Sequence, residues 1–360
     1  MTRAYINRIG TAVPPHDIHQ AFIAFVEGFI PGRRERVLFD RMAQRSGIEH
    51  RYSFFAPRED MSEAGDTEGF FRRGAFPGTA ARMARFERDG VALAAQAVAA
   101  LGIEDEAVSH LVVASCTGFT APGLDQVLME RLGLDSSIER TMVGFMGCSA
   151  AVNALRTAHH IVRSEPQARV LVVNVELCTL HLQESPDVGA ILTALLFGDG
   201  ASAALVTADP AGLALRDFKA ATIPGTQDLI TWRIADQGFD MGLSGEVPAA
   251  IAQALRSELD RNDSGGILRG ARPADFDLWA VHAGGRTVLD AVEQGLELGE
   301  EALGVSRAVL RENGNMSSAT IMFVLERMLR ERSAQGASGL GMAFGPGMVA
   351  ETFRFERLAA

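Results

Sequence analysis

The chain has 360 residues, of which 47% are hydrophobic, and its formal net charge is −11 at pH 7. A chain of this length can bury one large core or two fused ones, and its acidity argues against general binding to nucleic acid. Its three cysteines do not make a disulfide framework, and none has the Cys-x-x-Cys spacing of a metal site. No apolar window is long enough for a membrane span and the first residues lack a signal-peptide core, so we expect a cytoplasmic protein.

Short apolar runs alternate with segments of helical periodicity along the chain. The runs that predict strands are residues 6–13, 109–115, 141–145, 169–174, 201–207, 213–220 and 276–281. The segments that predict helices are residues 20–51, broken near Pro31, and residues 82–101, 150–162 and 286–298. Residues 59–79 are polar and rich in glycine, and we expect an irregular excursion over the surface. Strands that alternate with helices indicate an α/β fold with right-handed crossovers.

Arginines gather in the first helical segment, at positions 33, 34, 36, 41 and 45. Arg41 and Arg45 lie four residues apart, so they share one face of the helix. The planar guanidinium donates hydrogen bonds to phosphate well, which makes this segment a candidate phosphate-binding patch. An ordinary solvated helix face is the alternative.

Cys148 lies where the predicted strand at 141–145 turns into the helix at 150–162. The dipole at a helix N-terminus favours a thiolate, and the small residues around Cys148 let a substrate approach. The helix presents one apolar face, formed by Ala151, Ala154, Leu155, Ala158 and Val162. Cys148 is therefore a candidate nucleophile, and a structural cysteine buried in the core is the alternative.

Two further segments each present one polar side chain among small residues. His282 follows the strand at 276–281 and precedes two glycines, and Asn315 precedes an apolar run at 319–325. Taken singly, a structural histidine and a helix N-cap are the simpler interpretations. Together with Cys148 they supply a thiol, an imidazole that stabilises its thiolate, and an amide. The imidazole and the amide can both donate to an oxyanion, so these groups suffice to move an acyl group through a thioester.

These segments resemble the type III polyketide synthases, the chalcone synthase-like enzymes of the thiolase superfamily. The resemblance extends over about residues 6–355 and includes Leu-Phe-Gly-Asp-Gly-Ala at 196–201 and Asn-Met-Ser-Ser-Ala at 315–319. The family's Gly-Phe-Gly-Pro-Gly loop reads Ala-Phe-Gly-Pro-Gly at 343–347. The resemblance implies a catalytic triad of Cys148, His282 and Asn315. It also implies a thiolase-like fold in five α-β-α-β-α layers, with similar halves at 1–215 and 216–360, and a homodimer.

The resemblance also implies roles for the residues around the triad. Phe197 and Met241 would form the gate between the coenzyme A tunnel and the cavity, with Met241 in place of a second phenylalanine. The residues implied to contact coenzyme A are Arg41, Arg45, Gly284 and Thr287. Those implied for the cavity are Cys116, Ala121, Cys178, His181, Trp232, Ser317, Phe344, Gly345 and Pro346. Ala121 replaces a larger residue that reaches into the partner's cavity, and Trp232 stands where plant enzymes often keep a small residue.

The activity implied by the resemblance is an iterative condensation without a metal or redox cofactor. An acyl-CoA starter would load onto Cys148, and malonyl-CoA would extend it until the chain cyclises to a pyrone, a resorcinol or a phloroglucinol. Ala121 and Met241 could open an apolar tunnel, which favours a fatty acyl starter, whereas Trp232 argues against a simply enlarged cavity. A single-step ketoacyl-ACP synthase III and a non-catalytic acyl-CoA-binding scaffold are the alternatives.

Overall fold

The structure is a computed structural model that describes residues 2–103, 107–331 and 336–358. Its strands are β1 (Ala4–Ala12), β2 (His16–Asp17), β3 (Tyr52–Ser53), β4 (His110–Ser115), β5 (Glu139–Gly144), β6 (Val170–Leu177), β7 (Asp199–Thr207), β8 (Leu213–Thr222), β9 (Ile230–Ala235), β10 (Gly238–Leu243), β11 (Leu278–Val281), β12 (Ser338–Gly345) and β13 (Val349–Arg357). Its helices are α1 (His19–Glu27), α2 (Arg33–Arg45), α3 (Thr79–Leu101), α4 (Leu124–Arg131), α5 (Ala150–Ser164), α6 (Val188–Leu196), α7 (Val247–Leu259), α8 (Arg286–Gly295), α9 (Gly304–Asn313) and α10 (Ala319–Arg330). Short 3-10 turns are η1 (Gly147–Ser149), η2 (Cys178–His181) and η3 (Pro273–Asp275).

Nine strands form one mixed sheet in the order β11-β12-β13-β8-β1-β7-β6-β4-β5. Strand β8 pairs with β13 along most of its length and with β1 only over Ala4–Ile6. The sheet therefore consists of two parts, β11-β12-β13-β8 and β1-β7-β6-β4-β5, that meet at this short pairing.

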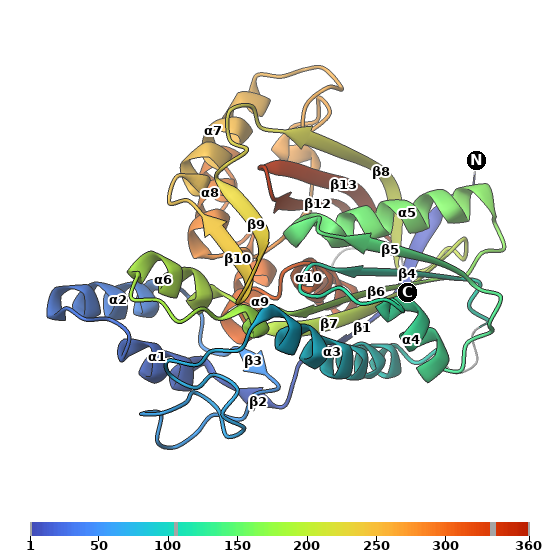
Figure 1. The fold of residues 1–360 in the computed structure, drawn as a ribbon. Helices are drawn as coiled ribbons and strands as arrows, with labels where there is room; N and C mark the ends of the chain where they lie inside the picture. Colours follow the sequence, from blue (N-terminus) through green and yellow to red (C-terminus); the bar gives the residue numbers. More distant parts are fainter. Residues whose placement is uncertain (1, 104–106, 332–335, 359–360) are drawn as a thin grey trace.

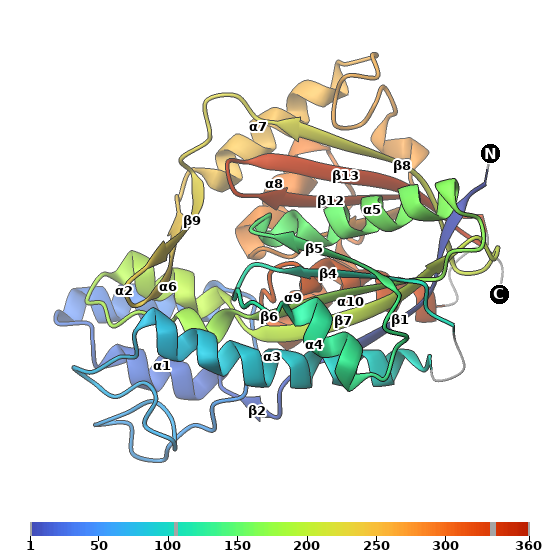
Figure 2. The ribbon, with the colours of Figure 1, turned by 45° about the vertical axis from the view of Figure 1, so that its right-hand side comes forward.

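Helices and the two parts of the sheet stack as five layers (Figures 1 and 2). Helices α5 and α10 lie between the two parts, α3 and α4 cover the outer face of one, and α7, α8 and α9 cover the outer face of the other. Three buried apolar clusters fill the interfaces between helices and sheet: one lies under α3 and α4, one surrounds α5 and α10 between the two parts, and one lies under α7, α8 and α9. The thiolase-like α/β fold expected from the sequence is confirmed.

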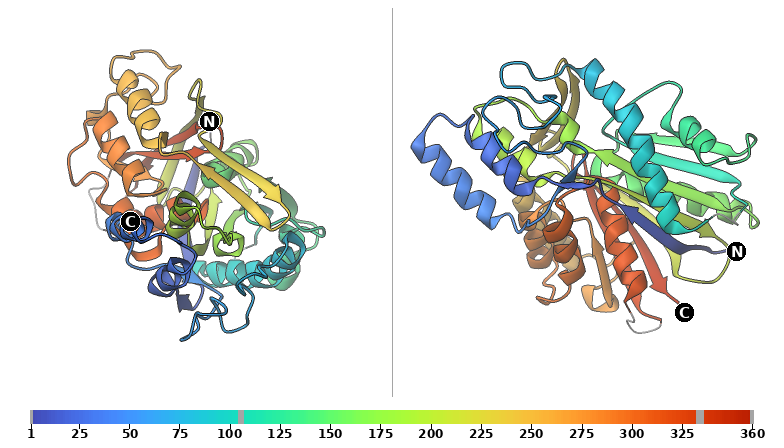
Figure 3. Two further views of the ribbon diagram at one scale, coloured as in Figure 1. Left: turned by 60° about the vertical axis from the view of Figure 1, so that its left-hand side comes forward. Right: turned by 90° about the horizontal axis from the view of Figure 1, so that it is seen from below.

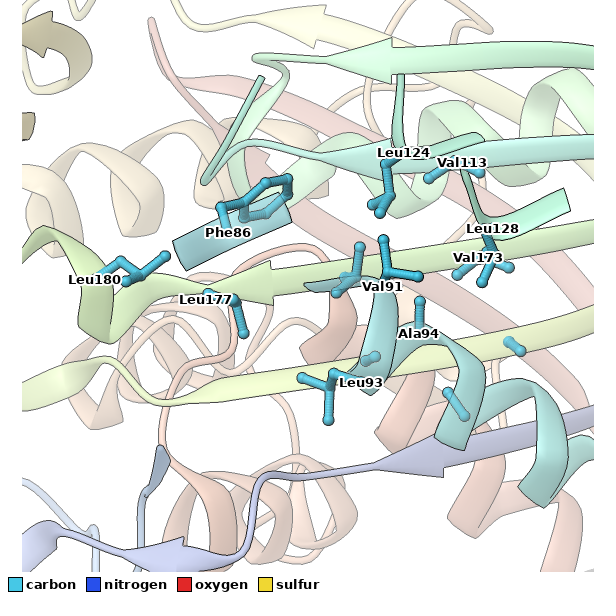
Figure 4. Packing of buried hydrophobic residues seen from close by; sticks show 14 of the residues in the cluster. Phe86, Val91, Leu93, Ala94, Val113, Leu124, Leu128, Val173, Leu177 and Leu180 are labelled. Carbon is cyan, nitrogen blue, oxygen red and sulfur yellow. The ribbon is translucent and has the colours of Figure 1, made fainter. Parts of the chain in front are cut away.

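Strand β4 shows why the central strands read as unbroken apolar runs. Leu111 and Val113 face α3, whereas Val112 and Ala114 face α5. Successive side chains of a strand point to opposite faces, so a strand covered by helices on both faces must be apolar at every position. Figure 4 shows part of the first cluster, where Val91 and Ala94 of α3 and Leu124 and Leu128 of α4 lie over Val113 and Val173.

The structure confirms the seven predicted strands and the break in the first helical segment. Helix α1 ends at Glu27 and α2 begins at Arg33, on either side of Pro31. Residues 59–78 contain only turns, bends and isolated bridges, as expected. The pairs β9–β10 and β12–β13 were not predicted as strands. No helix in the described ranges is long and apolar enough to cross a bilayer.

Helices α1, α2 and α6 gather with the β9–β10 pair at one end of the molecule (Figures 1 and 3). Helix α6 contacts α1, α2 and β10, so these four elements form one group. This group borders the cavity in which the candidate catalytic residues lie.

Candidate active site

A cavity of about 990 Å³ is lined by Cys148, His282 and Asn315 together. The three residues come from the turn before α5, the end of β11 and the turn before α10. The volume lies at the upper end of the range usual for small-molecule sites. The structure thus brings together the three residues that the sequence proposed as a triad.

Cys148 lies in η1, between the end of β5 and the first turn of α5. The loop after β12 packs against this turn. Gly147 has φ +59, and a Cβ there would lie 2.3 Å from the ring of Pro346. Gly345 is equally confined, because a Cβ there would lie 2.5 Å from Ser149 Oγ. The Gly-Pro-Gly loop therefore packs closely against the turn that carries Cys148.

Burial raises the pKa of the Cys148 thiol to about 12, and hydrogen bonds from Ser317 and Asn315 act in the opposite direction. His282 is 2% exposed, and burial lowers the pKa of its imidazole to about 3. Desolvation therefore favours a neutral thiol beside a neutral imidazole, and it acts against the thiolate that the sequence analysis expects. The hydrogen bonds to sulfur are the interactions of this site that offset it.

Neither nitrogen of the His282 ring has a hydrogen-bond partner among the described residues, although the main-chain N–H donates to the Met342 carbonyl at 2.8 Å. A buried imidazole without partners is costly, and such groups are rare in folded proteins. A substrate oxygen or a thiol proton would satisfy these nitrogens. The bare ring is therefore the part of this site that most directly indicates a ligand.

Asn315 is fixed by hydrogen bonds on both sides of its amide. Its Oδ1 accepts from Ser317 N–H at 2.8 Å, and its Nδ2 donates to the Gly284 carbonyl at 3.0 Å. Its second Nδ2 N–H bonds the Cys148 sulfur and is the donor that a ligand oxygen would take over. Helix α10 begins at Ala319 with Ser318 as its N-cap, so Asn315 is not the cap residue that the simpler interpretation suggested.

Most of the other predicted site residues also line the cavity. They are Phe197, Met241, Cys116, Cys178, His181, Trp232, Ser317, Phe344, Pro346, Arg45, Gly284 and Thr287. Arg41, Ala121 and Gly345 are not among the lining residues. Arg41 and Ala121 are exposed on the surface of this single chain, and Gly345 lies behind Ser149.

An aromatic wall formed by His181, Trp232 and Phe239 closes one side of the cavity. The His181 and Phe239 rings stack with centroids 4.2 Å apart, and Trp232 meets both edge-on. Trp232 Nε1 donates to the Cys116 carbonyl at 2.8 Å, which fixes the indole close to the cysteine turn. His181 is held between the Thr117 carbonyl and the Phe239 N–H. The wall is therefore rigid.

Sequence reasoning missed Glu176, which is fully buried behind the cysteines. Its carboxylate accepts from Cys116 N–H at 3.0 Å, Thr117 Oγ1 at 2.9 Å and Ser318 Oγ at 2.5 Å. Burial raises the pKa of this carboxyl to about 7 despite these bonds. A charged residue inside the apolar strand β6 was the available signal, since such residues are almost never buried without partners.

Sequence reasoning also missed an apolar branch of the cavity. The branch is lined by the rings of Phe22 and Phe25 from α1 and by those of Phe55 and Phe71. Ser53 and Thr179, joined by a hydrogen bond of 2.8 Å, line the cavity next to Phe55 and Cys178. No motif marks these phenylalanines, because they come from α1 and from an irregular segment without periodicity.

Comparison with known proteins agrees with this geometry. The family described as chalcone and stilbene synthases matches the chain over residues 1–210 with its N-terminal domain and over residues 215–359 with its C-terminal domain. A Mycobacterium tuberculosis protein named "Alpha-pyrone synthesis polyketide synthase-like Pks18" is 33% identical over 376 aligned positions, which cover 99% of this chain and 91% of that one. Bisdemethoxycurcumin synthase from Oryza sativa is 35% identical over 376 positions, with 97% and 91% covered.

Among solved structures, 1,3,6,8-tetrahydroxynaphthalene synthase from Streptomyces coelicolor superimposes with a TM-score of 0.86 at 28% identity, covering 99% of this chain and all of the other. The chain therefore belongs to the chalcone and stilbene synthase family. It is a type III polyketide synthase, a condensing acyltransferase. This membership does not favour the ketoacyl-ACP synthase III alternative.

Proposed function

We propose that the protein loads an acyl-CoA starter onto Cys148 and extends it by repeated decarboxylative condensation with malonyl-CoA. The extended chain then cyclises and leaves. The observation that carries this proposal is that Cys148, His282 and Asn315 converge on one large cavity from three separated segments. No step of this reaction requires a metal or a redox cofactor.

In the loading step, Cys148 Sγ attacks the thioester carbonyl carbon while its proton moves to the ring of His282. The partnerless nitrogens of His282 make it the acceptor for that proton. His282 then returns the proton to the sulfur of the departing coenzyme A. Burial favours a neutral thiol and a neutral imidazole, so the thiol proton would move to His282 as the sulfur attacks.

In the extension step, malonyl-CoA loses carbon dioxide and leaves an enolate. His282 and the Asn315 N–H that otherwise bonds the Cys148 sulfur donate to the enolate oxygen, and one such donor is worth ~3 kcal/mol of barrier. The enolate carbon attacks the thioester carbonyl of acyl-Cys148 and displaces the cysteine thiolate. The chain is then two carbons longer, and it is bound to the coenzyme A of the extender.

The apolar branch supports a fatty acyl starter. Its phenylalanine rings offer a long aliphatic tail a dry surface, and burying such a tail stabilises the complex by about 0.8 kcal/mol per methylene. The aromatic wall of His181, Trp232 and Phe239 forms a separate part of the cavity lining. A long starter followed by few extensions fits this division, and a pyrone or resorcinol would be the product. The name of the mycobacterial relative supports the pyrone.

The proposal is tested by incubating the purified protein with malonyl-CoA and acyl-CoA starters from acetyl to palmitoyl, with coumaroyl included. Products are identified by mass spectrometry. We expect pyrones or resorcinols from the wild type and none from Cys148→Ala. A product that appears only when an acyl carrier protein is supplied would overturn the proposal in favour of a ketoacyl-ACP synthase III.

We also propose that the protein is a homodimer. Strand β5 is an edge of the nine-stranded sheet, and most of its residues are exposed in the single chain. Four of the exposed large apolar side chains belong to β5 or to neighbouring segments: Phe119, Val127, Met142 and Met146. An exposed apolar edge strand invites pairing with a second copy. Sedimentation equilibrium on the wild type and on Met142→Glu tests this, because the variant should be monomeric.

A further inference from the structure

Helix α2 differs from the other helices of the described chain in how little of it packs on the protein. Only Phe39 and Ala43 of its thirteen residues are buried. Asp40 is half-buried and the other residues of the helix are exposed. The helix lies at one end of the molecule (Figure 3). At 3.6 residues per turn, Arg34, Leu38, Arg41 and Arg45 share the face opposite Phe39 and Ala43.

The charge of α2 is unbalanced. The helix holds five arginines and two acidic residues in a chain whose net charge is −11. None of the five arginines forms an ion pair with any residue that the structure describes, although Arg36 donates to the Ile30 carbonyl at 2.8 Å. Elsewhere the described arginines commonly pair with carboxylates, as Arg307 does with Asp290. The arginines of α2 are thus available to an external anion.

Exposed aliphatic side chains lie among these arginines. Val37 is 44% exposed, Leu38 51% and Met42 45%, and they are three of the eight large apolar side chains that the described chain exposes. Leu38 lies on the face of Arg34 and Arg41, and Val37 and Met42 border that face. Arginine beside exposed aliphatic side chains is the pattern of a helix that lies in the headgroup region of a membrane.

The position of α2 relates this surface to the reaction. Met42 and Arg45, near the end of the helix, line the cavity. Arg33 and Arg34, at its start, lie about 16 Å away along the axis and do not line the cavity. The first two turns of α2 therefore extend beyond the cavity.

We propose that α2 docks the protein on an anionic phospholipid bilayer, with the mouth of the cavity turned toward the lipid. The arginines would contact the phosphate headgroups, and Val37, Leu38 and Met42 would enter the layer beneath them. An acidic protein would also be attracted by the arginines, but three exposed aliphatic side chains interleaved with them favour a surface that is anionic above and apolar below. The inference rests on the proposed function only for the molecules that would pass between the membrane and the cavity. These are long acyl-CoA esters and alkylated products, which both partition into bilayers.

The test is co-sedimentation of the purified full-length protein with vesicles of pure phosphatidylcholine and with vesicles containing about one third phosphatidylglycerol. We expect binding to the anionic vesicles about tenfold or more tighter than to the neutral ones, and weaker binding as salt is raised. The variant Arg33→Glu/Arg34→Glu should lose about tenfold or more of this affinity, and Leu38→Glu should lose affinity as well. Arg272→Glu, which changes an 80% exposed arginine outside α2, is the matched control and should bind as the wild type does.

The melting temperature should be the same in all four proteins, because none of the substituted side chains is buried. Equal sedimentation of the wild type and the double variant would overturn the proposal. A double variant that keeps its lipid affinity but no longer accepts an acyl group from an acidic carrier protein would also overturn the proposal. That result would show that α2 binds a protein and not a membrane. Vesicle binding needs no catalysis, so failure of the proposed function would not be mistaken for failure of this inference.

Discussion

Arg51 donates a hydrogen bond from Nη1 to the main-chain carbonyl of Phe197 at 2.6 Å. Arg51 is 1% exposed, and no carboxylate in the described part of the chain forms an ion pair with it. The main chain next to Phe197 is in turn bonded to Asn315, because Asn315 N–H donates to Leu196 at 2.8 Å and the Asn315 carbonyl accepts from Gly198 at 3.0 Å. One buried guanidinium therefore fixes the segment that carries the gate residue and, through it, the segment that carries the amide donor.

Replacing Arg51 should damage extension more than loading. Arg51→Met removes the donor to Phe197, so Asn315 would lose its alignment, whereas Cys148 and His282 are held by other segments. We expect extension to slow by about a hundredfold, as for loss of one oxyanion donor, with a much smaller effect on acylation of Cys148. Acylation is followed by intact-protein mass spectrometry and extension by product formation.

The matched control for Arg51 is Arg73→Met. Arg73 also donates to main-chain carbonyls, those of Phe25 and Met61, but it does not line the cavity. It should therefore change stability without separating the two steps. If Arg51→Met slowed loading and extension equally, Arg51 would be merely structural.

Ser317 should set the reactivity of Cys148. Its hydrogen bond to the cysteine lowers the thiol pKa against the larger effect of burial. Ser317→Ala removes a donor that stabilises the thiolate, so the pKa of Cys148 should rise further, by about one unit for an interaction of about 1.4 kcal/mol. The rate of alkylation by iodoacetamide, measured against pH, should then increase at higher pH than in the wild type.

Ser244→Ala is the control for that measurement, because Ser244 lines the same cavity but bonds to Glu246 N–H. Its alkylation profile should match that of the wild type. A Ser317→Ala profile shifted toward lower pH, or not shifted, would show that the hydrogen bond does not stabilise the thiolate.

Trp232 should limit the number of extensions. Its indole fills the space beside Cys116 and is fixed by one hydrogen bond and two ring contacts. Trp232→Ala should open that space, so products should gain one or more malonyl-derived units, at a cost of about 3 kcal/mol in the free energy of unfolding. Trp232→Phe keeps most of the bulk and should keep the wild-type products. Unchanged product length in the alanine variant would contradict a limiting role.

The sequence predicted the fold wherever a periodic pattern reflects burial. Strands such as β4 are covered on both faces, and Cys148, His282 and Asn315 lie beside small residues that leave a readable motif. The amphipathic face of α5 was also read correctly, since its five predicted residues are all buried.

Arg51 and the phenylalanine branch could not be predicted in the same way. Arg51 meets Phe197 across 146 residues of chain, and neither position belongs to a repeating pattern. Phe22, Phe55 and Phe71 converge from a helix and an irregular segment, so their common location depends on tertiary packing alone. Tertiary contacts of this kind leave no pattern in the local sequence.

Glu176 should make stability depend on pH in a direction opposite to that of a paired carboxylate. Its pKa is about 7 in the folded protein, and an unfolded glutamate titrates near ~4.3. Between these values the unfolded chain loses the proton while the folded protein keeps it. The free energy of unfolding therefore falls as pH rises through this window, by about 4 kcal/mol from this residue, and levels off above it.

Glu176→Gln removes this titration while keeping an acceptor for Cys116 N–H and Thr117. Urea unfolding at about pH 5 and about pH 8 should show a smaller loss of stability across the window in the variant than in the wild type. Asp199, whose pKa burial also raises to about 7, would leave a residual slope in both proteins. Glu139→Gln, at an exposed position on β5, should retain the wild-type slope. Identical slopes in the wild type and Glu176→Gln would mean that Glu176 is already ionised in the folded state at pH 5, held there by its three hydrogen bonds.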